Sequence, residues 1–276
     1  MDSFRWDFDS SSFNLYPFGD IHLGSPQSDE PFARQVVKKI KDDPKGVWVG
    51  MGDLMENALV GSKSDVYTQT IPPKEQVEYL TELLKPIKEK CLFLIAGNHE
   101  QRTMRLAGLS PEQFIAYNLG VPFRGFSCYA YFTVPVGDKC TTTKDGIRRC
   151  GFECYFHHNY GGGYTMGGKV NSAEKLRLIT PTADAIFSGH FHITSRIPNS
   201  WRELSHTIDP PTIINRTGYD YITGSALSWD KSYAEERAKK PSSKEFIMVK
   251  FSAKRGNTGC DRIQEYHIIT PDKEMG

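Results

Sequence analysis

Short fragments rich in aspartate, histidine and asparagine recur along the first two thirds of this 276-residue chain. Carboxylate oxygens and imidazole nitrogens bind divalent cations together, and this mixture suits Mn, Fe, Zn or Ni better than Ca or a thiolate-bound metal. Taken together, the fragments supply the ligands of a two-metal hydrolytic site. They are Asp20-Ile21-His22, Gly52-Asp53, Gly97-Asn98-His99-Glu100, His157-His158 and Gly189-His190-Phe191-His192.

Most of these fragments follow a short apolar segment of the kind that forms a buried strand. In open α/β sheets, ligands gather beyond the carboxyl ends of the strands, so we expect the fragments to share one edge. Apolar residues at helical spacing predict helices over 32–40, 74–87 and 111–119, the second bent or ended near Pro86. The strands in question span residues 13–18, 46–49, 91–96 and 183–187.

The rest of the chain favours β structure. Residues 128–156 are rich in aromatic and β-branched residues on either side of a turn-rich basic stretch, which predicts an antiparallel hairpin excursion. A helix is expected over 171–179, and strands of a second sheet over 205–276, around a charged segment at 230–244. Without a linker or repeat to divide it, the sequence predicts a single domain over 1–276.

The composition does not identify a binding partner of the protein. The net charge is +1 with a pI near 7.6, so no global positive field indicates a nucleic-acid binder. No run of about 18 apolar residues and no targeting segment occurs, which predicts a cytoplasmic protein without a membrane span. Nothing in the sequence specifies an oligomeric state.

The six cysteines are too few for a disulfide scaffold. Cys91 lies in an apolar run and is expected to be buried. Cys140, Cys150 and Cys154 cluster without zinc-site spacing, so we predict free thiols, with a hairpin disulfide or a small metal clip as the alternative.

The ordered fragments resemble the pattern of the calcineurin-like metallophosphoesterase superfamily: Asp-x-His, Gly-Asp, Gly-Asn-His-Glu, His, then Gly-His-x-His. The match runs from Asp20 to His192, about two thirds of the chain. The resemblance implies an α/β fold, a four-layer α/β/β/α sandwich of the metallophosphoesterase type. It also implies two divalent metal ions, with Mn as the first expectation and Fe, Zn or Ni as alternatives.

By the resemblance, Asp20, His22 and His192 hold one metal, and Asp53 bridges. The resemblance implies that Asn98, His157 and His190 bind the second metal. His99 then remains free to protonate a leaving oxygen or to stabilise charge on the phosphoryl group.

Several residues near the pattern keep two interpretations. Of the histidine pair we prefer His157 as the ligand, with His158 as the alternative ligand or a substrate contact. Glu56 stands where an acidic residue in the superfamily orients the catalytic histidine, and is otherwise a surface carboxylate. Arg102 and Arg105 follow the Gly-Asn-His-Glu loop at helical spacing, where they reach a substrate phosphate or form a solvated helix face.

Basic and histidine residues elsewhere are expected to be structural. Lys144, Arg148 and Arg149 are interpreted as an exposed turn, with polyanion binding as the alternative. His206 and His267 are isolated and are interpreted as surface or core residues.

The predicted function is hydrolysis of a phosphodiester by metal-activated hydroxide, with nucleic acid or a nucleotide as the substrate. The His-His-Asn segment resembles that of repair nucleases in the superfamily. The Gly-rich and Ser232-Tyr233-Ala234-Glu235 segments resemble phosphoesterases carried by phages and plasmids.

Two alternatives remain. The first is a phosphomonoesterase, although Glu56-Asn57-Ala58 departs from the Gly-Asp-x-x-Asp-Arg-Gly signature of protein phosphatases. The second is a non-catalytic scaffold of the same fold, which would show itself by missing ligands.

Overall fold

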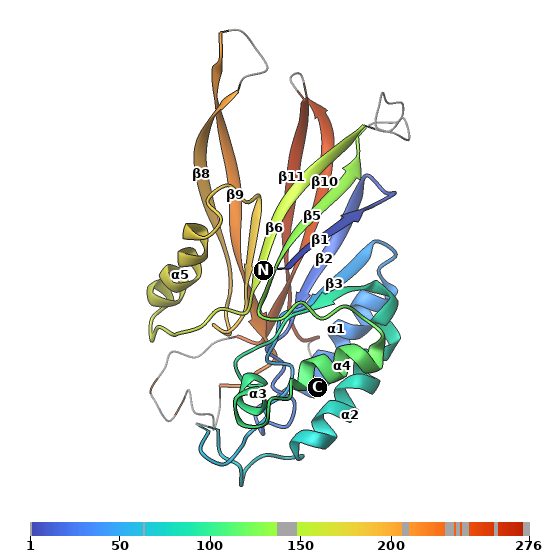
Figure 1. Cartoon of the computed structure of the whole chain (residues 1–276), viewed down its shortest axis with the longest axis vertical. Helices are drawn as coiled ribbons and strands as arrows, with labels where there is room; N and C mark the ends of the chain where they lie inside the picture. The colour runs from blue at the N-terminus through green and yellow to red at the C-terminus, as the bar shows by residue number, and fades with distance from the viewer. Residues whose placement is uncertain are drawn as a thin grey trace.

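Eleven strands form one mixed sheet in the part of the chain that the computed structural model describes. The described residues are 2–62, 64–136, 148–205, 210–229, 235, 238, 243–256 and 259–272. Helices flank the strands, so the predicted α/β class is confirmed (Figure 1). Within the described residues, no helix is both long enough and apolar enough to cross a bilayer.

The sheet has two halves joined by a narrow contact, in which Phe246 and Glu245 of β10 pair with Gly224 and Ser225 of β9. One half runs β1-β5-β6-β7-β9 with β8 on β9, and the other runs β10-β2-β3-β4 with β11 on β10. The strands of the first half are β1 (Asp2–Asp7), β5 (Ser127–Pro135), β6 (Arg149–His157), β7 (Ala185–Ser188), β8 (Thr194–Ser205) and β9 (Thr212–Ser225). Those of the second half are β2 (Ser12–Phe18), β3 (Gly46–Gly50), β4 (Cys91–Leu94), β10 (Glu245–Gly256) and β11 (Gly259–Ile269).

The two halves pack face to face through an aromatic core. Phe13 and Phe251 of one half contact Phe132 and Phe152 of the other, with ring centroids 5.1–5.4 Å apart. Aromatic pairs at this separation add to the gain from apolar burial. The seam between the halves is therefore a packed interior, and whatever lies at its end is held by both halves.

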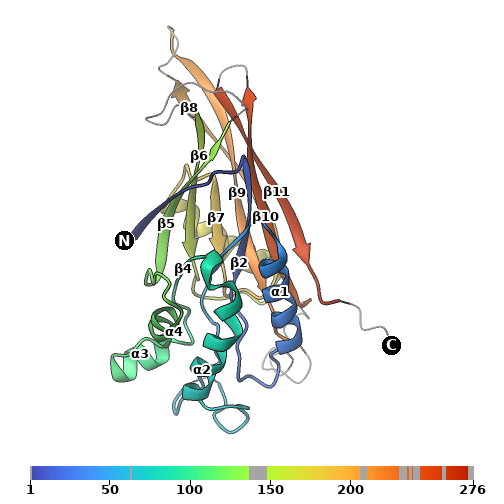
Figure 2. The same cartoon turned by 90° about the vertical axis from the view of Figure 1, so that its right-hand side faces the viewer.

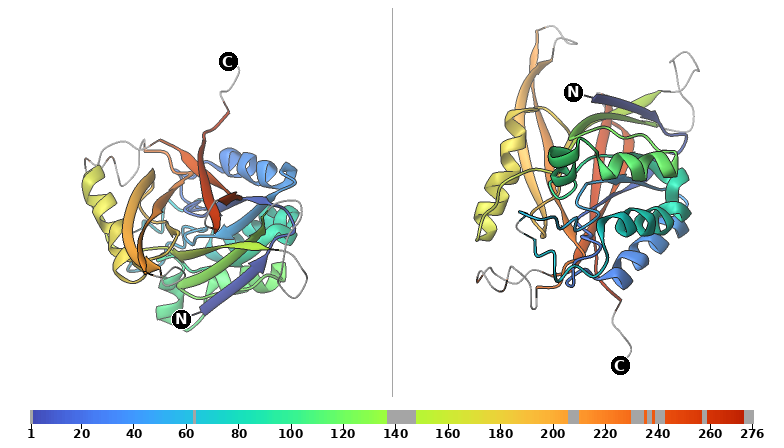
Figure 3. Two further views of the ribbon diagram at one scale, coloured as in Figure 1. Left: turned by 90° about the horizontal axis from the view of Figure 1, so that it is seen from above. Right: turned by 60° about the horizontal axis from the view of Figure 1, so that its bottom comes forward.

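Helices cover the outer faces of both halves. The helices of the β2-β3-β4 side are α1 (Glu30–Asp42), α2 (Pro73–Leu84), the 3-10 helix η1 (Lys85–Lys90), α3 (Gln101–Ala107) and α4 (Pro111–Leu119). Helices α1, α2 and α4 bury their apolar sides against this half (Figure 2). On the other side, α5 (Met166–Glu174) and the 3-10 helix η2 (Lys175–Leu178) pack on β6, β7 and β9 (Figure 3).

Local sequence explains where these helices begin. The Asp29 side chain accepts a hydrogen bond from the Phe32 N–H and caps α1, whose Phe32, Val36 and Ile40 are buried at helical spacing. The predicted helix over 74–87 ends at Leu84, just before Pro86, and continues as η1. The helix expected over 171–179 instead begins five residues earlier, at Met166 after the capping Thr165.

Two predictions of arrangement need correction. The antiparallel hairpin of β5 and β6 exists, but it lies within the sheet between β1 and β7 rather than as an excursion from it. The strands after residue 205 do not form a separate sheet, because β9 pairs with β7 while β10 pairs with β2. Strands β1 and β8 lie in segments for which the sequence predicted no strand.

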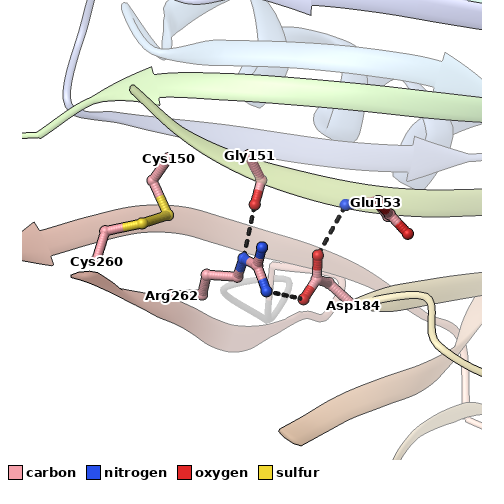
Figure 4. The surroundings of a disulfide bond; sticks show 6 residues. All are labelled: Cys150, Gly151, Glu153, Asp184, Cys260 and Arg262. Atoms are coloured by element: carbon pink, nitrogen blue, oxygen red, sulfur yellow. Dashed lines mark hydrogen bonds and ion pairs between the residues drawn. A yellow bond between two sulfur atoms is a disulfide. The ribbon is translucent and has the colours of Figure 1, made fainter. Parts of the chain in front are cut away.

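The cysteine prediction is wrong at one position. Cys150 forms a disulfide with Cys260 of β11, 110 residues away (Figure 4), while Cys154 and Cys91 are free thiols. Other predicted features lie outside the described residues: Cys140, Lys144, His206, Ser232 to Ala234 and most of the charged segment 230–244.

Candidate metal centre

The chemistry-bearing residues meet at one end of the seam between the two halves. They stand on the loops that leave the carboxyl ends of neighbouring parallel strands, β2-β3-β4 in one half and β6-β7 in the other. Figure 1 shows these strand ends gathered beside α3. By loop, the residues are Asp20 and His22 after β2, Asp53 after β3, Asn98 and His99 after β4, His158 after β6, and His190 and His192 after β7.

The backbone at these positions is strained. Five of the residues have positive φ angles, a conformation that costs free energy for any residue with a Cβ and that clusters at functional sites. The loops also approach closely, since a Cβ on Gly97 would lie 2.1 Å from the Asp53 N. The φ values are 49° for Asp20, 51° for His22, 48° for Asp53, 72° for His190 and 52° for His192.

One group of ligand atoms comes from Asp20, His22 and His192. Asp20 Oδ1 lies 3.3 Å from His192 Nε2 and 3.8 Å from His22 Nε2, and the two imidazole nitrogens face each other at 3.2 Å. Asp20 is fully buried, and both of its carboxylate oxygens accept from the His190 N–H. A cation among these three atoms would satisfy two nitrogens that otherwise compete for one proton.

A second group comes from Asp53, His158 and His190. His158 is 2% exposed, its Nδ1 donates to the Met51 carbonyl at 2.7 Å, and its Nε2 lies 3.0 Å from Asp53 Oδ2. Asn98 joins this group, with its Oδ1 3.2 Å from the same Nε2. Since His158 Nδ1 carries the proton, Nε2 is left as the ligand atom.

The structure brings His158, and not the preferred His157, into the centre. His157 still pairs with Ser127 in β6, and its Nδ1 accepts from the Asn159 N–H at 2.6 Å. Cys150, Phe152, Cys154 and Phe156 alternate along β6 toward the seam, so the next inward residue is His158. This period of two was the signal in the sequence that decides between the two histidines.

Asp53 belongs to the second group and also adjoins the first. Its Oδ1 accepts from the His99 N–H at 2.8 Å, while its Oδ2 lies 3.8 Å from His22 Nε2 and 3.0 Å from His158 Nε2. Within the described part of the chain, His190 Nδ1 is buried without a hydrogen-bond partner. A buried polar atom left in this way is costly, and a bound cation would be a suitable partner for it.

The charges of the centre also fit cations. Burial by itself raises the pKa of Asp20 and of Asp53, but the surrounding histidines lower both well below the usual range. Burial lowers the pKa of His22 and of His158, yet the neighbouring carboxylates raise them to about 10 and about 9. At neutral pH, His22 and His158 are therefore protonated at positions where a metal would bind. The residues present fit a pair of divalent cations.

Comparison with known proteins agrees with this geometry. Residues 14–194, about two thirds of the chain, match the family described as "Calcineurin-like phosphoesterase". The chain belongs to the calcineurin-like phosphoesterase family. This confirms the resemblance drawn from the ordered fragments.

Other comparisons add little. No curated protein matched the chain. Among solved structures, it is similar to Vacuolar Protein Sorting 29 from Cryptosporidium parvum at 14% identity, covering 93% of this chain and 98% of that one. The TM-score of 0.39 is too low to support an argument.

Within this phosphoesterase centre, His99 lies at the rim, with 14% of its side chain exposed. Its Nδ1 donates to the Glu56 main-chain carbonyl at 2.8 Å, and its ring centroid is 4.4 Å from that of His22. Burial lowers the pKa of His99 to about 4, so the ring is neutral and its Nε2 has a free lone pair. Nε2 is 3.9 Å from Asp53 Oδ2, and His99 forms a third group of possible ligand atoms with His22 and Asp53.

The Glu56 carboxylate lies near both His99 and His22, and it is closer to His22. Oε2 lies 3.2 Å from His22 Nδ1 and 3.6 Å from His99 Nδ1, so the predicted dyad with His99 is made by the Glu56 backbone instead. Burial opposes ionisation, but His22 lowers the pKa of Glu56 to about 2. Glu56 is thus an ionised residue that orients the His22 ring, with His22 Nε2 directed toward Asp20 and His192.

The two arginines take different positions from those predicted for phosphate contacts. Arg102 Nη1 donates to the carbonyls of Glu56 and Asn57 and to Ser64 Oγ, which commits the guanidinium to the loop around His99. Arg105 is exposed on α3 and donates to Gln101.

Three buried residues support the centre without having been predicted. Asn57 Nδ2 donates to the His99 carbonyl, and Glu100 accepts from the N–H groups of Asp53 and Met55 at 3.1 Å each. Glu112 of α4 accepts from the Gly97 N–H at 3.0 Å. Glu100 belongs to the Gly-Asn-His-Glu fragment and so had a sequence signal, whereas Glu112 had none.

Proposed function

We propose that this family member is a dinuclear metal-dependent phosphoesterase that hydrolyses phosphodiester bonds of nucleic acid or nucleotides. The observation that carries the proposal is Asp53, whose Oδ2 lies 3.0 Å from His158 Nε2 and 3.8 Å from His22 Nε2 and so adjoins ligand atoms of both groups. When bound, two divalent cations, Mn²⁺ first among them, supply an activated water and neutralise charge on the phosphoryl group.

The protein's own residues position the substrate and move the proton. Loops from both sheet halves surround the centre, and His99 Nε2 faces the space between the ligand groups. The negative charge of a bound phosphate favours protonation of this nitrogen, after which His99 can donate the proton to the leaving oxygen. The backbone contact of Nδ1 with Glu56 keeps the ring in this orientation.

The arginine contacts favour a diester over a monoester. A monoester dianion carries one more negative charge and calls for an additional cation at the centre. Arg102, the nearest arginine in the sequence to His99, already donates to backbone carbonyls of its own loop. A diester with a single negative charge fits this arrangement better.

A scaffold without activity is the alternative of another class. The aspartate and histidine residues expected from the family pattern lie close together, with His158 in place of His157. A degenerate site would lack part of this set, so the complete set supports catalysis.

The test uses purified protein loaded with Mn²⁺ and two substrates, bis-p-nitrophenyl phosphate and p-nitrophenyl phosphate. We expect turnover of the diester that stops with a chelator. Faster turnover of the monoester would replace the diesterase proposal with a phosphatase. No turnover of either ester by protein shown to contain metal would contradict the enzyme proposal.

The role of His99 is tested by His99→Ala, with His267→Ala on the exposed face of β11 as the matched control. His99→Ala is expected to keep its metal content and to lose about 10²- to 10⁴-fold in kcat, the range for loss of a general acid. Metal content is measured by mass spectrometry. Metal loss equal to the activity loss would make His99 a ligand instead.

A further inference from the structure

The loop that follows His158 is fixed to the body of the protein by the Asn159 side chain. Asn159 has a positive φ of 74°. Its Nδ2 donates to Ser188 Oγ at the end of β7 and to the Ser172 carbonyl in α5. Its Oδ1 accepts from the Tyr160 N–H at 2.7 Å, and its own N–H donates to His157. The position of Tyr160 is therefore set by contacts to β6, β7 and α5.

The same loop contacts the metal centre directly. The Gly161 carbonyl accepts a hydrogen bond from His190 Nε2, which leaves His190 Nδ1 as the buried, unpartnered atom. The Gly161 backbone has a φ of 101°, which only glycine adopts readily. A change in this loop would thus be felt at a ligand of the second metal group.

The Tyr160 side chain buries little of its surface against the rest of the protein. Its side chain is 71% exposed, and its ring lies nearly parallel to the His190 ring, at 11° with centroids 6.4 Å apart. A solvent-exposed tyrosine alone needs no explanation. Here, however, the backbone on both sides is anchored, and the ring stands beside a residue of the candidate catalytic centre with much of its surface open.

We propose that Tyr160 is a stacking platform for a planar base of the substrate, so that the preferred phosphodiesters carry a nucleobase. This assignment rests on the proposed function and narrows it to nucleotide-derived diesters. Stacking on an exposed aromatic ring tolerates any base, because every base has a π-face. It uses the tyrosine ring and not the hydroxyl, so phenylalanine should substitute.

The test compares two esters that release the same p-nitrophenolate: thymidine 5′-(p-nitrophenyl phosphate) and methyl p-nitrophenyl phosphate. The quantity measured is the ratio of their kcat/KM values with Mn²⁺-loaded protein. Tyr160→Ala is expected to lower the preference for the thymidine ester about tenfold, as expected for the loss of one base-stacking contact. Tyr160→Phe is expected to keep the wild-type ratio, as is Tyr117→Ala, a control at an 83% exposed tyrosine of α4.

The outcomes separate the two proposals. An unchanged ratio in Tyr160→Ala, with both esters still hydrolysed, would overturn the stacking assignment while leaving the diesterase proposal intact. An equal fall of the ratio in Tyr160→Phe would also overturn it, because the ring would then not be the recognised group. Failure of the metal-loaded wild type to hydrolyse either ester would overturn the proposed function and the stacking assignment with it.

Discussion

At the end of the seam where the metal centre lies, the two sheet halves meet through buried carboxylates, imidazoles and residues with positive φ angles. At the other end they are joined by the Cys150–Cys260 disulfide and by polar contacts that leave the interacting groups paired. At the metal centre, by contrast, His190 Nδ1 is buried without a hydrogen-bond partner.

The contacts of the far end link β11, β6 and the entry to β7 (Figure 4). Arg262 donates to the Gly151 carbonyl at 2.7 Å and pairs with Asp184 Oδ1 at 3.3 Å, while Asp184 Oδ2 accepts from the Glu153 N–H. Such a region contributes stability without any ligand. The positive φ angles of the ligand loops and the unpartnered His190 Nδ1 thus lie at the end with the candidate metal centre. Substitutions at the metal centre should therefore lower activity, whereas substitutions at the disulfide end should lower the free energy of unfolding.

The largest effect is expected from Asp53→Asn, which removes a negative charge between both ligand groups. Metal content should fall, and diester hydrolysis should drop by more than about a hundredfold, because even residues that only support metal ligands cost about 10- to 100-fold. Metal is measured by mass spectrometry and activity at saturating Mn²⁺. Glu265→Gln, at a 46% exposed carboxylate of β11, is the control. Full metal content in Asp53→Asn would contradict the shared position of this residue.

A smaller loss is expected at Glu112, which touches no ligand side chain. Burial and the charge of Glu100 raise the pKa of Glu112 well above the usual range, so it is a neutral carboxyl that can donate to Glu100 while accepting from Gly97. Glu112→Gln keeps both functions and should resemble the wild type. Glu112→Leu should weaken Mn²⁺ affinity or kcat about 10- to 100-fold. Titration calorimetry and kinetics would show this, and equal behaviour of the two variants would exclude the positioning role.

At the far end, Cys150→Ser should change stability alone. Loss of a disulfide that closes a long loop costs about 2–4 kcal/mol of unfolding free energy. Urea denaturation of metal-loaded protein measures that loss, while kcat for the diester is expected to remain at the wild-type value. A large fall in kcat in protein that is still folded would show that the two ends are coupled.

The smallest effect concerns the metal-free protein and its pH dependence. His22 and His158 have folded pKa values of about 10 and 9, above the unfolded value, so their contribution to stability is full below about pH 6.5 and is lost toward pH 10. His99 and His190, both lowered to about 4, oppose folding as the pH falls from about 6.5 to 4. The Tm of chelator-treated protein should thus be highest near neutrality. A metal-loaded sample should lose less Tm between pH 7 and 10.

The order of the aspartate and histidine fragments was enough to predict the family and the strand ends that carry the centre. The order alone does not decide between His157 and His158, because that choice depends on which face of β6 points into the seam; the alternation of apolar residues along β6 carries that information. The contact of Glu112 with Gly97 and the Cys150–Cys260 disulfide could not be predicted for another reason. The two residues of each contact are 15 and 110 residues apart in the sequence, and only packing of the folded chain brings them together.

The separation of His22 and His192 by 170 residues has a consequence for how the protein forms. During synthesis Asp20, His22 and Asp53 leave the ribosome long before the loop after β7, and domains fold only as their parts become available. Until that loop arrives, the early carboxylates lack the imidazoles of His190 and His192. The two ligand groups that contain these histidines are therefore completed only when both halves have closed on each other.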